Sequence, residues 1–201
     1  MIPAFILVGG YGTRIKSTLG DTPKVLADIR GKPFLTILMD SLYKRGIRKF
    51  VLCLAHESDK IQAVATEWLW SSTPEGCHLY FDDQAKPAGT IDAIKRACER
   101  IDEEFAFVFN GDSFCDVDLA KLSEHRRADV CAVVDKNREA VGAFLINRVK
   151  FSSLNPGMHK NLDTEFLKYL GKRASYFTID APWWDIGTSE GLWAFWKDGA
   201  K

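Results

Sequence analysis

The sequence has few of the features that define disulfide-rich, membrane-spanning or secreted proteins. Its five cysteines are odd in number and widely spaced, with no Cys-x-x-Cys pair, which argues against a disulfide framework and a zinc knuckle. No apolar stretch approaches the roughly 18 residues of a membrane span. The first residues form a short apolar run without a preceding basic region, which is typical of a buried strand and not of a signal peptide. We therefore expect a cytoplasmic protein with reduced thiols and no membrane partner.

An excess of charge of one sign is also missing. Lysine and arginine number 27, and so do aspartate and glutamate. This balance argues against a long basic surface for nucleic acid, although it allows a local basic pocket. The hydrophobic fraction of 46% is ordinary for a globular protein, and no internal repeat, low-complexity tract or clear linker divides the 201 residues. The sequence therefore predicts one domain over residues 1–201 with no nucleic-acid partner.

Apolar runs of strand length alternate with segments of helical spacing along the chain. The predicted strands are 4–8, 49–55, 77–81, 105–109, 130–134 and 141–146, and the predicted helices are 33–45, 59–70, 90–100 and 119–127. Such alternation calls for right-handed β-α-β units. We therefore expect an α/β, three-layer, Rossmann-like fold with a mostly parallel central sheet and helices on both faces. The aromatic-rich tail from residue 177 is expected to pack back onto this domain.

Loops that follow strands of a parallel sheet are the expected place for a ligand. Loops 9–14, 82–89 and 110–112 each come directly after a predicted strand. In open α/β sheets ligands bind beyond the carboxyl ends of the strands. These loops should therefore open onto one crevice.

The loop 9–14 has the composition of a phosphate cradle. Its glycines let the backbone approach a ligand and point N–H groups into a concavity, although a plain turn explains them equally well. A P-loop is excluded because the required Gly-Lys-Ser/Thr is absent, and Ile15 occupies the third glycine position of a dinucleotide fingerprint. Arg14 and Lys24 favour the cradle, because arginine's planar fork and lysine's compact charge both suit phosphate oxygens.

Two aspartates are candidate metal ligands. Asp112 follows an apolar strand at its carboxyl end, where a metal role competes with a turn or capping role. Asp185 lies between Trp184 and Ile186, where an unpartnered buried carboxylate would be costly, so it needs a metal or a structural hydrogen bond. Mg²⁺ typically takes one or two carboxylates together with phosphate oxygens and water.

Other polar residues have simpler interpretations. Asp116 and Asp118 imitate an Asp-x-Asp metal motif, but we assign them mainly to capping a helix that begins at Leu119. Asp82 and Asp83 are expected to be a solvated loop pair. The histidines have no ligand spacing and are interpreted as structural.

Several of these motifs together resemble those of a known enzyme family. The Gly-Gly-x-Gly-Thr-Arg of 9–14 is followed by the Thr-Pro-Lys-Val-Leu of 22–26. Further matches occur in the same order at 32–35, 87–90, 110–112, 135–136 and 184–188. This combination resembles the sugar-phosphate nucleotidyltransferases, which include the glucose-1-phosphate thymidylyltransferases and the short bacterial heptose-1-phosphate guanylyltransferases. The similarity spans nearly the whole chain.

The resemblance implies a role for each matching position. Catalysis would fall to Arg14 and Lys24. Nucleotide binding would involve Gly9, Gly10, Gly12, Thr13, Arg14, Gln84, Gly89 and Thr90. Sugar-phosphate binding would involve Asp135, Lys136 and Gly142, and Asp112 and Asp185 would hold Mg²⁺.

The implied reaction joins a nucleoside triphosphate to a sugar 1-phosphate and releases pyrophosphate. A sugar phosphate is already an anionic nucleophile, so alignment and charge neutralisation matter more than a general base. GTP is the first choice of nucleotide and a heptose 1-phosphate, for surface polysaccharide precursors, is a candidate acceptor. The alternatives are a metal-dependent glycosyltransferase of related fold, using Asp116 and Asp118, and a non-catalytic nucleotide-binding module. The base, the sugar and the assembly state, a homo-oligomer included, stay open.

The sequence departs from the family pattern in its second part. An NTP-binding part of about 1–128 would be followed by a shortened sugar-phosphate-binding part of about 129–201, in which about one hairpin of the family is absent. Asp135 is one methylene shorter than the glutamate usual there, and Ala88 stands where leucine is common. A shortened sugar site of this kind would either accept a smaller or unusual phosphate or have lost activity.

Overall fold

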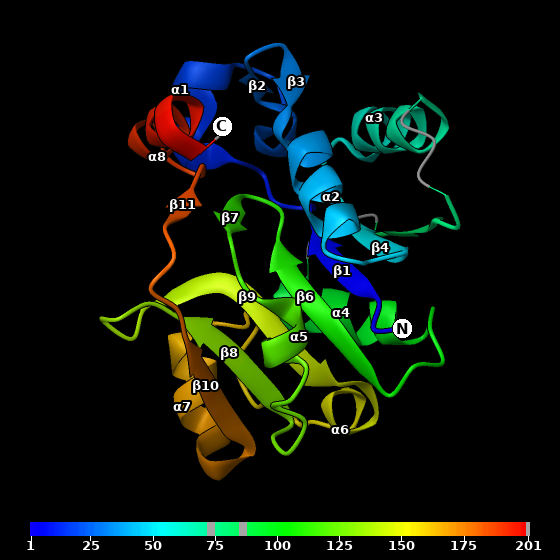
Figure 1. Cartoon of the computed structure of the whole chain (residues 1–201), viewed down its shortest axis with the longest axis vertical. Helices are drawn as coiled ribbons and strands as arrows, with labels where there is room; N and C mark the ends of the chain where they lie inside the picture. The colour runs from blue at the N-terminus through cyan, green and yellow to red at the C-terminus, as the bar shows by residue number, and fades with distance from the viewer. Residues whose placement is uncertain (72–74, 85–87, 200–201) are drawn as a thin grey trace.

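A computed structural model describes residues 1–71, 75–84 and 88–199 and has a seven-stranded sheet at its centre (Figure 1). In spatial order its strands are β10 (Ala174–Thr178), β8 (Val130–Val134), β9 (Ala140–Asn147), β6 (Phe105–Asn110), β1 (Ala4–Leu7), β4 (Lys49–Leu54) and β5 (His78–Asp83). Neighbouring strands run parallel except that β9 is antiparallel to both β6 and β8. The predicted mostly parallel sheet is confirmed.

Helices cover both faces of the sheet. They are α1 (Lys16–Leu19), α2 (Phe34–Lys44), α3 (Ser58–Ser71), α4 (Thr90–Cys98), α5 (Leu119–Leu122), α6 (Arg148–Ser152), α7 (Thr164–Leu170) and α8 (Ser189–Ala194). Short helical turns lie at Thr13–Ile15, Lys24–Leu26, Gly171–Arg173 and Phe195–Gly199. Two small antiparallel ribbons lie outside the main sheet. One pairs β2 (Asp28–Ile29) with β3 (Lys32–Pro33), and the other pairs β7 (Ser113–Cys115) with β11 (Trp183–Asp185). In Figure 1, α8 lies beside α1, and the Thr18 and Ser189 hydroxyls are 2.6 Å apart.

The strand periodicity divides the interior into two apolar layers. Ala4 and Ile6 of β1 face the layer that contains α2 and α3, whereas Phe5 between them faces the layer that contains α4, α6 and α7. Successive side chains of a strand point to opposite faces, and a parallel sheet covered on both sides needs apolar residues at every position. This is why the central strands are continuous apolar runs in the sequence.

The structure corrects two predictions about polar segments. Asp82 is not a solvated loop residue: it lies in β5, is 1% exposed and accepts hydrogen bonds from Arg96 of α4. The helix predicted over 119–127 ends at Leu122. The residues that follow it, 123–127, are all polar or charged and offer no apolar side chain that would hold a longer helix on the core.

The aromatic tail packs back onto the domain, as expected. Phe195 is fully buried and contacts Phe34 and Phe114, with ring centroids 5.1 Å apart in both pairs. Trp193 and Trp196, by contrast, are exposed. The tail therefore uses part of its aromatic surface to close the layer around α2 and to hold β11 against β7.

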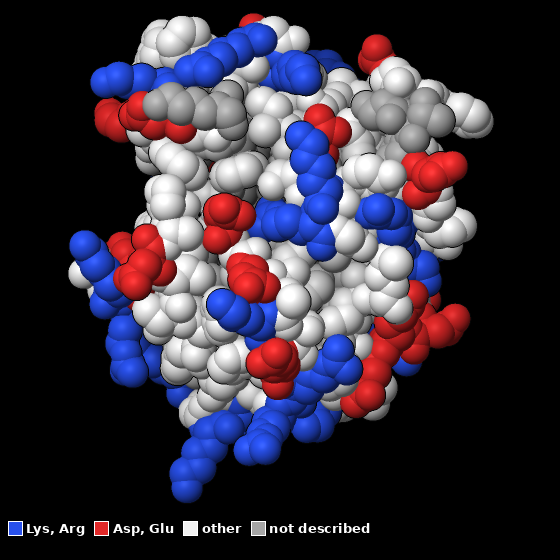
Figure 2. Space-filling model, in the orientation of Figure 1, with Lys and Arg blue, Asp and Glu red and all other residues white. Residues whose placement is uncertain are grey.

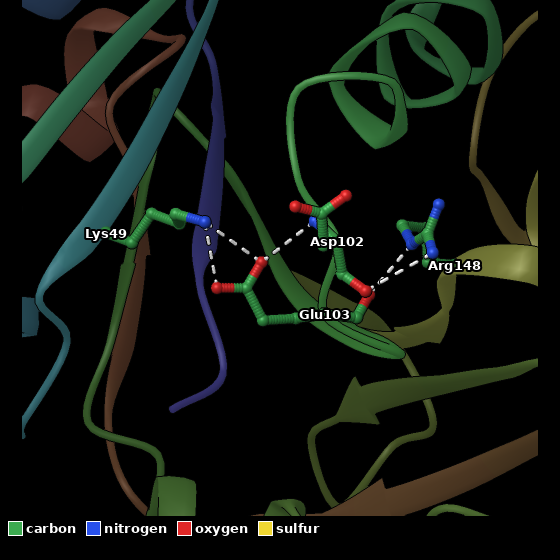
Figure 3. Close-up of polar contacts among 4 residues, drawn as sticks. All are labelled: Lys49, Asp102, Glu103 and Arg148. Atoms are coloured by element: carbon green, nitrogen blue, oxygen red, sulfur yellow. Dashed lines mark hydrogen bonds and ion pairs between the residues drawn. The ribbon is translucent and has the colours of Figure 1, made fainter.

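A small polar cluster fixes the amino-terminal ends of the central strands (Figure 3). Lys49, the first residue of β4, donates to both Glu103 carboxylate oxygens at 2.9 and 3.1 Å, and Arg148 donates to the Glu103 carbonyl oxygen at 2.8 Å. Burial alone would raise the Glu103 pKa, but the hydrogen bonds from Lys49 and from backbone N–H groups lower it overall. This cluster lies at the end of the sheet away from the strand-end loops.

The substitution Glu103→Gln should reduce the free energy of unfolding by about 0.5–1 kcal/mol at pH 7, the range of a partly exposed ion pair. Because the folded-state pKa is lowered, this contribution is present above about pH 4, where an unfolded glutamate titrates, and disappears as the pH falls through the folded-state value. Urea unfolding of both proteins between pH 7 and pH 3 measures it. A difference that stays constant over that range would contradict the ion-pair explanation.

The surface agrees with the balanced composition. On the face drawn in Figure 2, lysine and arginine side chains are interspersed with aspartate and glutamate side chains. Within the described residues, no helix combines the length and apolar character needed to cross a membrane.

Candidate nucleotide-binding site

A cavity of about 260 Å³ opens at the carboxyl ends of the central strands. All three strand-end loops contribute to it, so the prediction of one shared crevice is confirmed. Its described lining is Leu7, Gly9, Gly10, Lys24, Cys53, Leu54, Ala55, Gln84, Ala88, Gly89, Thr90, Ala93, Asn110, Asp112 and Asn161. Burial raises the pKa of the Cys53 thiol, so this side chain stays neutral and is not a nucleophile.

The glycine loop after β1 closes over a lysine. A methyl group on Gly9 would lie 3.0 Å from the backbone nitrogen of Ala55, the residue after β4, so a larger residue would push the loop away from this strand. Methyl groups on Gly10 and Gly12 would each lie 3.6 Å from atoms of the Lys24 side chain, and Gly12 has φ of +61°. The loop thus wraps around Lys24 and exposes its own backbone to the cavity.

Lys24 forms an ion pair with Asp112. The lysine lies in a short helical turn whose next residue, Val25, is buried, which holds the side chain toward the site. Its Nζ donates to Asp112 Oδ2, and the two side chains are 17% and 15% exposed. Lys24 is therefore held at the site and is not free in solvent.

A short antiparallel ribbon brings the two predicted metal ligands together. Asp185 of β11 pairs with Ser113 of β7, the residue after Asp112, and the Ile186 N–H donates to the Asp112 carbonyl oxygen at 2.8 Å. Gly111 N–H donates to the Leu7 carbonyl oxygen at 2.9 Å, which ties the same turn to β1. Backbone hydrogen bonds therefore set the positions of both aspartates.

Arg14 joins the two aspartates around Gly187. A methyl group on Gly187 would lie 2.8 Å from Asp185 Oδ1, 3.0 Å from Arg14 Nη2 and 3.3 Å from Asp112 Oδ2. Asp185 Oδ1 also accepts from the Gly187 N–H at 2.7 Å. Arg14 and Asp185 thus cluster with Asp112, and glycine at position 187 leaves room for their side chains. Lys24 joins the cluster through its ion pair with Asp112, and these last two residues line the cavity.

This donor set fits Mg²⁺ better than a transition metal. Two carboxylates converge, and no group of three or more His, Cys, Asp or Glu residues within the described ranges is arranged to hold a metal ion. Two carboxylates leave the rest of the coordination to phosphate oxygens and water, as Mg²⁺ prefers, whereas structural zinc sites need four protein ligands.

Asp118, from the Asp-x-Asp pattern, caps α5 by accepting a hydrogen bond from the Lys121 N–H at 3.1 Å, so the capping interpretation is confirmed for this residue.

The end of the cavity beside β5 presents a buried amide. Gln84 is 6% exposed, and its Nε2 atom has no hydrogen-bond partner among the described residues. An unpaired buried donor is costly, so a ligand acceptor is the natural partner. The neighbouring Gly89 has φ of +108° and lies against the Lys160 carbonyl group. Of the family motif at 87–90, residue 87 lies outside the described residues.

Thr90 and Thr13, both predicted to bind the nucleotide, have less direct access to the cavity than Gln84. The Thr90 hydroxyl accepts from the Leu162 N–H at 2.6 Å, so this oxygen is used within the protein although the residue lines the cavity. Thr13 is exposed in the short helical turn that also contains Arg14.

The residues predicted to bind the sugar phosphate do not form one group. Asp135 lies in the turn after β8, where its Oδ1 accepts from the Asn137 and Glu139 N–H groups at 2.9 Å, and the Glu139 N–H chiefly lowers its pKa. Lys136 is exposed, and neither residue lines the described cavity. Gly142, with φ of +79°, lies against the Ser113 side chain beside the aspartate ribbon. Their roles stay predictions.

Sequence reasoning gave no role to two polar residues of the lining. Asn110 belongs to the motif at 110–112, and its Nδ2 would lie 3.0 Å from a methyl group on Gly142. Asn161 comes from the segment between α6 and α7, and no local pattern distinguishes it from an ordinary loop asparagine. Only the tertiary structure places it at the cavity.

The fold and site together define a Rossmann-like nucleotide-binding domain of the transferase type. The chain belongs to the family described as the MobA-like NTP transferase domain, whose model matches residues 4–173. It is 38% identical over 120 residues to the D-glycero-alpha-D-manno-heptose 1-phosphate guanylyltransferase of Campylobacter jejuni, which covers 59% of this chain and 51% of that protein. The enzyme of the same name from Aneurinibacillus thermoaerophilus is 32% identical over 139 residues, covering 68% and 58%. The chain thus spans about half the length of these curated relatives.

Solved structures extend the likeness to the whole domain. HddC from Yersinia pseudotuberculosis, complexed with GMP-PN, matches with a TM-score of 0.81 and 26% identity over 99% of this chain and 100% of that chain. A putative glucose-1-phosphate thymidylyltransferase from Bacillus anthracis matches with a TM-score of 0.79 and 19% identity, covering 98% and 96%, which supports the fold alone.

Proposed function

We propose that this protein is a Mg²⁺-dependent nucleotidyltransferase that couples a nucleoside triphosphate to a sugar 1-phosphate and releases pyrophosphate. The observation that carries the proposal is a cavity with Lys24 and Asp112 in its lining at one end and the unpaired Gln84 amide at the other. Arg14 and Asp185 converge on Asp112 beside the charged end. A charged end and a neutral amide end match a triphosphate and a base. The curated relatives named as guanylyltransferases support the same activity.

The reaction joins two anions, so its main requirement is charge neutralisation with alignment. The loop backbone at Gly9–Gly12 and the Arg14 guanidinium would bind the triphosphate, and Arg14 would stabilise the leaving pyrophosphate. Lys24 would contact the α-phosphate, where the sugar phosphate oxygen forms its new bond while the bond to the β-phosphate bridging oxygen breaks. Asp112 and Asp185 would hold Mg²⁺, which would supply positive charge to the phosphate oxygens. Positioning of this kind contributes on the order of 7–11 kcal/mol.

The names of the curated relatives indicate which particular substrates to test. We infer GTP as the nucleotide and a heptose 1-phosphate as the first acceptor to test, because the two curated relatives carry that name. Residues of about 1–128 would bind the nucleotide and those of about 129–201 the sugar phosphate. We place the reaction in the cytoplasm, where thiols stay reduced.

The decisive experiment is a screen of the purified chain with Mg²⁺, the four NTPs and a panel of sugar 1-phosphates, monitored for pyrophosphate. We expect release that needs both substrates and stops when EDTA removes the metal. Consumption of a ready-made nucleotide sugar without pyrophosphate would indicate the glycosyltransferase. NTP binding without turnover on any sugar phosphate would indicate the non-catalytic module.

A further inference from the structure

One residue of the cavity lining, Asn161, comes from a segment that carries no family motif. Residues 155–163, between α6 and α7, cross the start of α4. The Lys160 carbonyl oxygen accepts from the Ile91 N–H at 3.0 Å, and the Leu162 N–H donates to the Thr90 hydroxyl at 2.6 Å. Leu162 is 7% exposed and packs into the apolar layer around α4. These contacts fix the segment, which also satisfies N–H groups that a helix start otherwise leaves unpaired.

This segment places the Asn161 amide at the cavity. The Asn161 Oδ1 accepts from the Thr90 N–H at 3.4 Å, and Asn161 lines the cavity together with Gln84 and Gly89. A backbone N–H can only donate, so the atom that faces it must be the amide oxygen and not the nitrogen. The Nδ2 group therefore points elsewhere, and no described residue accepts a hydrogen bond from it. Asn161 is an exposed residue.

The position of Asn161 favours contact with a base over contact with phosphates. The charged side chains of the described lining are Lys24 and Asp112. Asp112 follows β6, whereas Gln84 follows the edge strand β5, and β1 and β4 separate those strands. Gln84, Gly89, Thr90 and Asn161 thus form a neutral group of amide, backbone and hydroxyl donors and acceptors away from the charged end. Neutral amides are suited to the hydrogen-bonding edge of a nucleobase.

We propose that Asn161 is a specificity-determining residue for the nucleobase, whose Nδ2 group donates to a carbonyl oxygen or ring nitrogen of the base while its Oδ1 stays on Thr90. This inference rests on the proposed function, because it takes the cavity to be the nucleotide site. It adds a base contact from the segment 155–163 to the one expected from Gln84.

The test is the isosteric variant Asn161→Asp, which keeps an oxygen for the Thr90 N–H and replaces the donor by an acceptor. We would measure kcat/KM for each of the four NTPs with the same sugar 1-phosphate and divide the value for the best NTP by the values for the others. The new negative charge repels all four triphosphates equally, so its effect cancels in this preference ratio. We expect the preference for the best NTP over the others to fall about three- to tenfold, as expected for one lost hydrogen bond. Asn161→Ala, which loses the donor without adding charge, should shift the ratio in the same direction.

The matched control is Asn155→Asp, in the same segment. The Asn155 Oδ1 accepts from the Gly157 N–H at 3.0 Å, and Asn155 is exposed and absent from the cavity lining. This variant adds the same charge and should keep the wild-type preference. Melting temperatures without nucleotide should match the wild type for both aspartate variants, which separates specificity from a purely structural role.

Two outcomes distinguish failure of this inference from failure of the proposed function. If the wild type releases pyrophosphate and both Asn161 variants keep its NTP preference within about twofold, Asn161 does not contact the base. If the wild type shows no turnover of any NTP and binds none by calorimetry, both the proposed function and this inference are wrong. If the wild type binds NTPs without turnover, dissociation constants replace kcat/KM in the same comparison.

Discussion

The substitution Asp112→Asn should lower kcat/KM for pyrophosphate release by about a thousandfold or more, with a smaller effect on folding. The change removes one of the two carboxylate charges that converge at Gly187 and that we assign to Mg²⁺. A loss of this size is about 4 kcal/mol of transition-state stabilisation, within the range of a lost electrostatic contact at a phosphoryl group. The turn should persist, because its hydrogen bonds to Ile186 and Leu7 come from the backbone. Mn²⁺ binding by calorimetry should weaken in parallel.

The control for this variant is Asp116→Asn. Asp116 is exposed directly after β7, on the other side of this strand from Asp112, and belongs to the Asp-x-Asp pattern that the glycosyltransferase alternative would use. Its replacement should leave pyrophosphate release within about twofold of the wild type, as expected for an exposed position outside the site. If Asp112→Asn kept wild-type activity, or if Asp116→Asn removed it, the metal assignment would be wrong.

The second large effect is expected from Arg14→Ala, which should lower kcat/KM for the NTP by about a hundredfold. The guanidinium lies at the space shared by Asp112 and Asp185, where it would neutralise the leaving pyrophosphate. Loss of one preorganised donor to a developing charge typically costs this much. Steady-state kinetics with varied NTP measure it, and the melting temperature should change little, because Arg14 is exposed.

Two further variants sharpen the Arg14 experiment. Lys16→Ala removes a nearby exposed cation, whose partner Asp21 is 3.9 Å away, and should leave kcat/KM nearly unchanged. Arg14→Lys keeps the charge but loses the planar fork, so its activity should lie between wild type and alanine. An equal loss of stability and activity in Arg14→Ala would show that the residue supports the loop and not the triphosphate.

The sequence predicted the centre of the fold because that part is governed by burial. Strands β1, β4 and β6 are covered on both sides, so their apolar runs stand out from the surrounding sequence. The sequence does not predict strand β10, because it lies at the sheet edge and none of its residues is fully buried. The antiparallel direction of β9 follows from how the chain returns after β8, which residue periodicity does not encode.

The site was predictable to the extent that strand ends and family motifs define it. The loops after β1, β5 and β6 had to share one edge of the sheet, and they do. The meeting of Asp112 with Asp185 depends on the β7–β11 ribbon, whose short strands have no distinctive local pattern, so only the resemblance indicated it. Asp82 was misjudged because its partner Arg96 comes from the next helix. Asn161 reaches the cavity through contacts of the segment 155–163 with α4, which no neighbouring residue in the sequence reveals.

The β7–β11 ribbon joins two aspartates that are made at different times during synthesis of the chain. The matched family region ends at residue 173, and Asp185 lies beyond it on β11. During synthesis Asp112 therefore leaves the ribosome well before Asp185, which stands opposite the neighbouring Ser113 in the ribbon. On the proposed assignment, a chain that has not yet added β11 lacks one of its two magnesium ligands, so turnover has to wait until the ribbon forms.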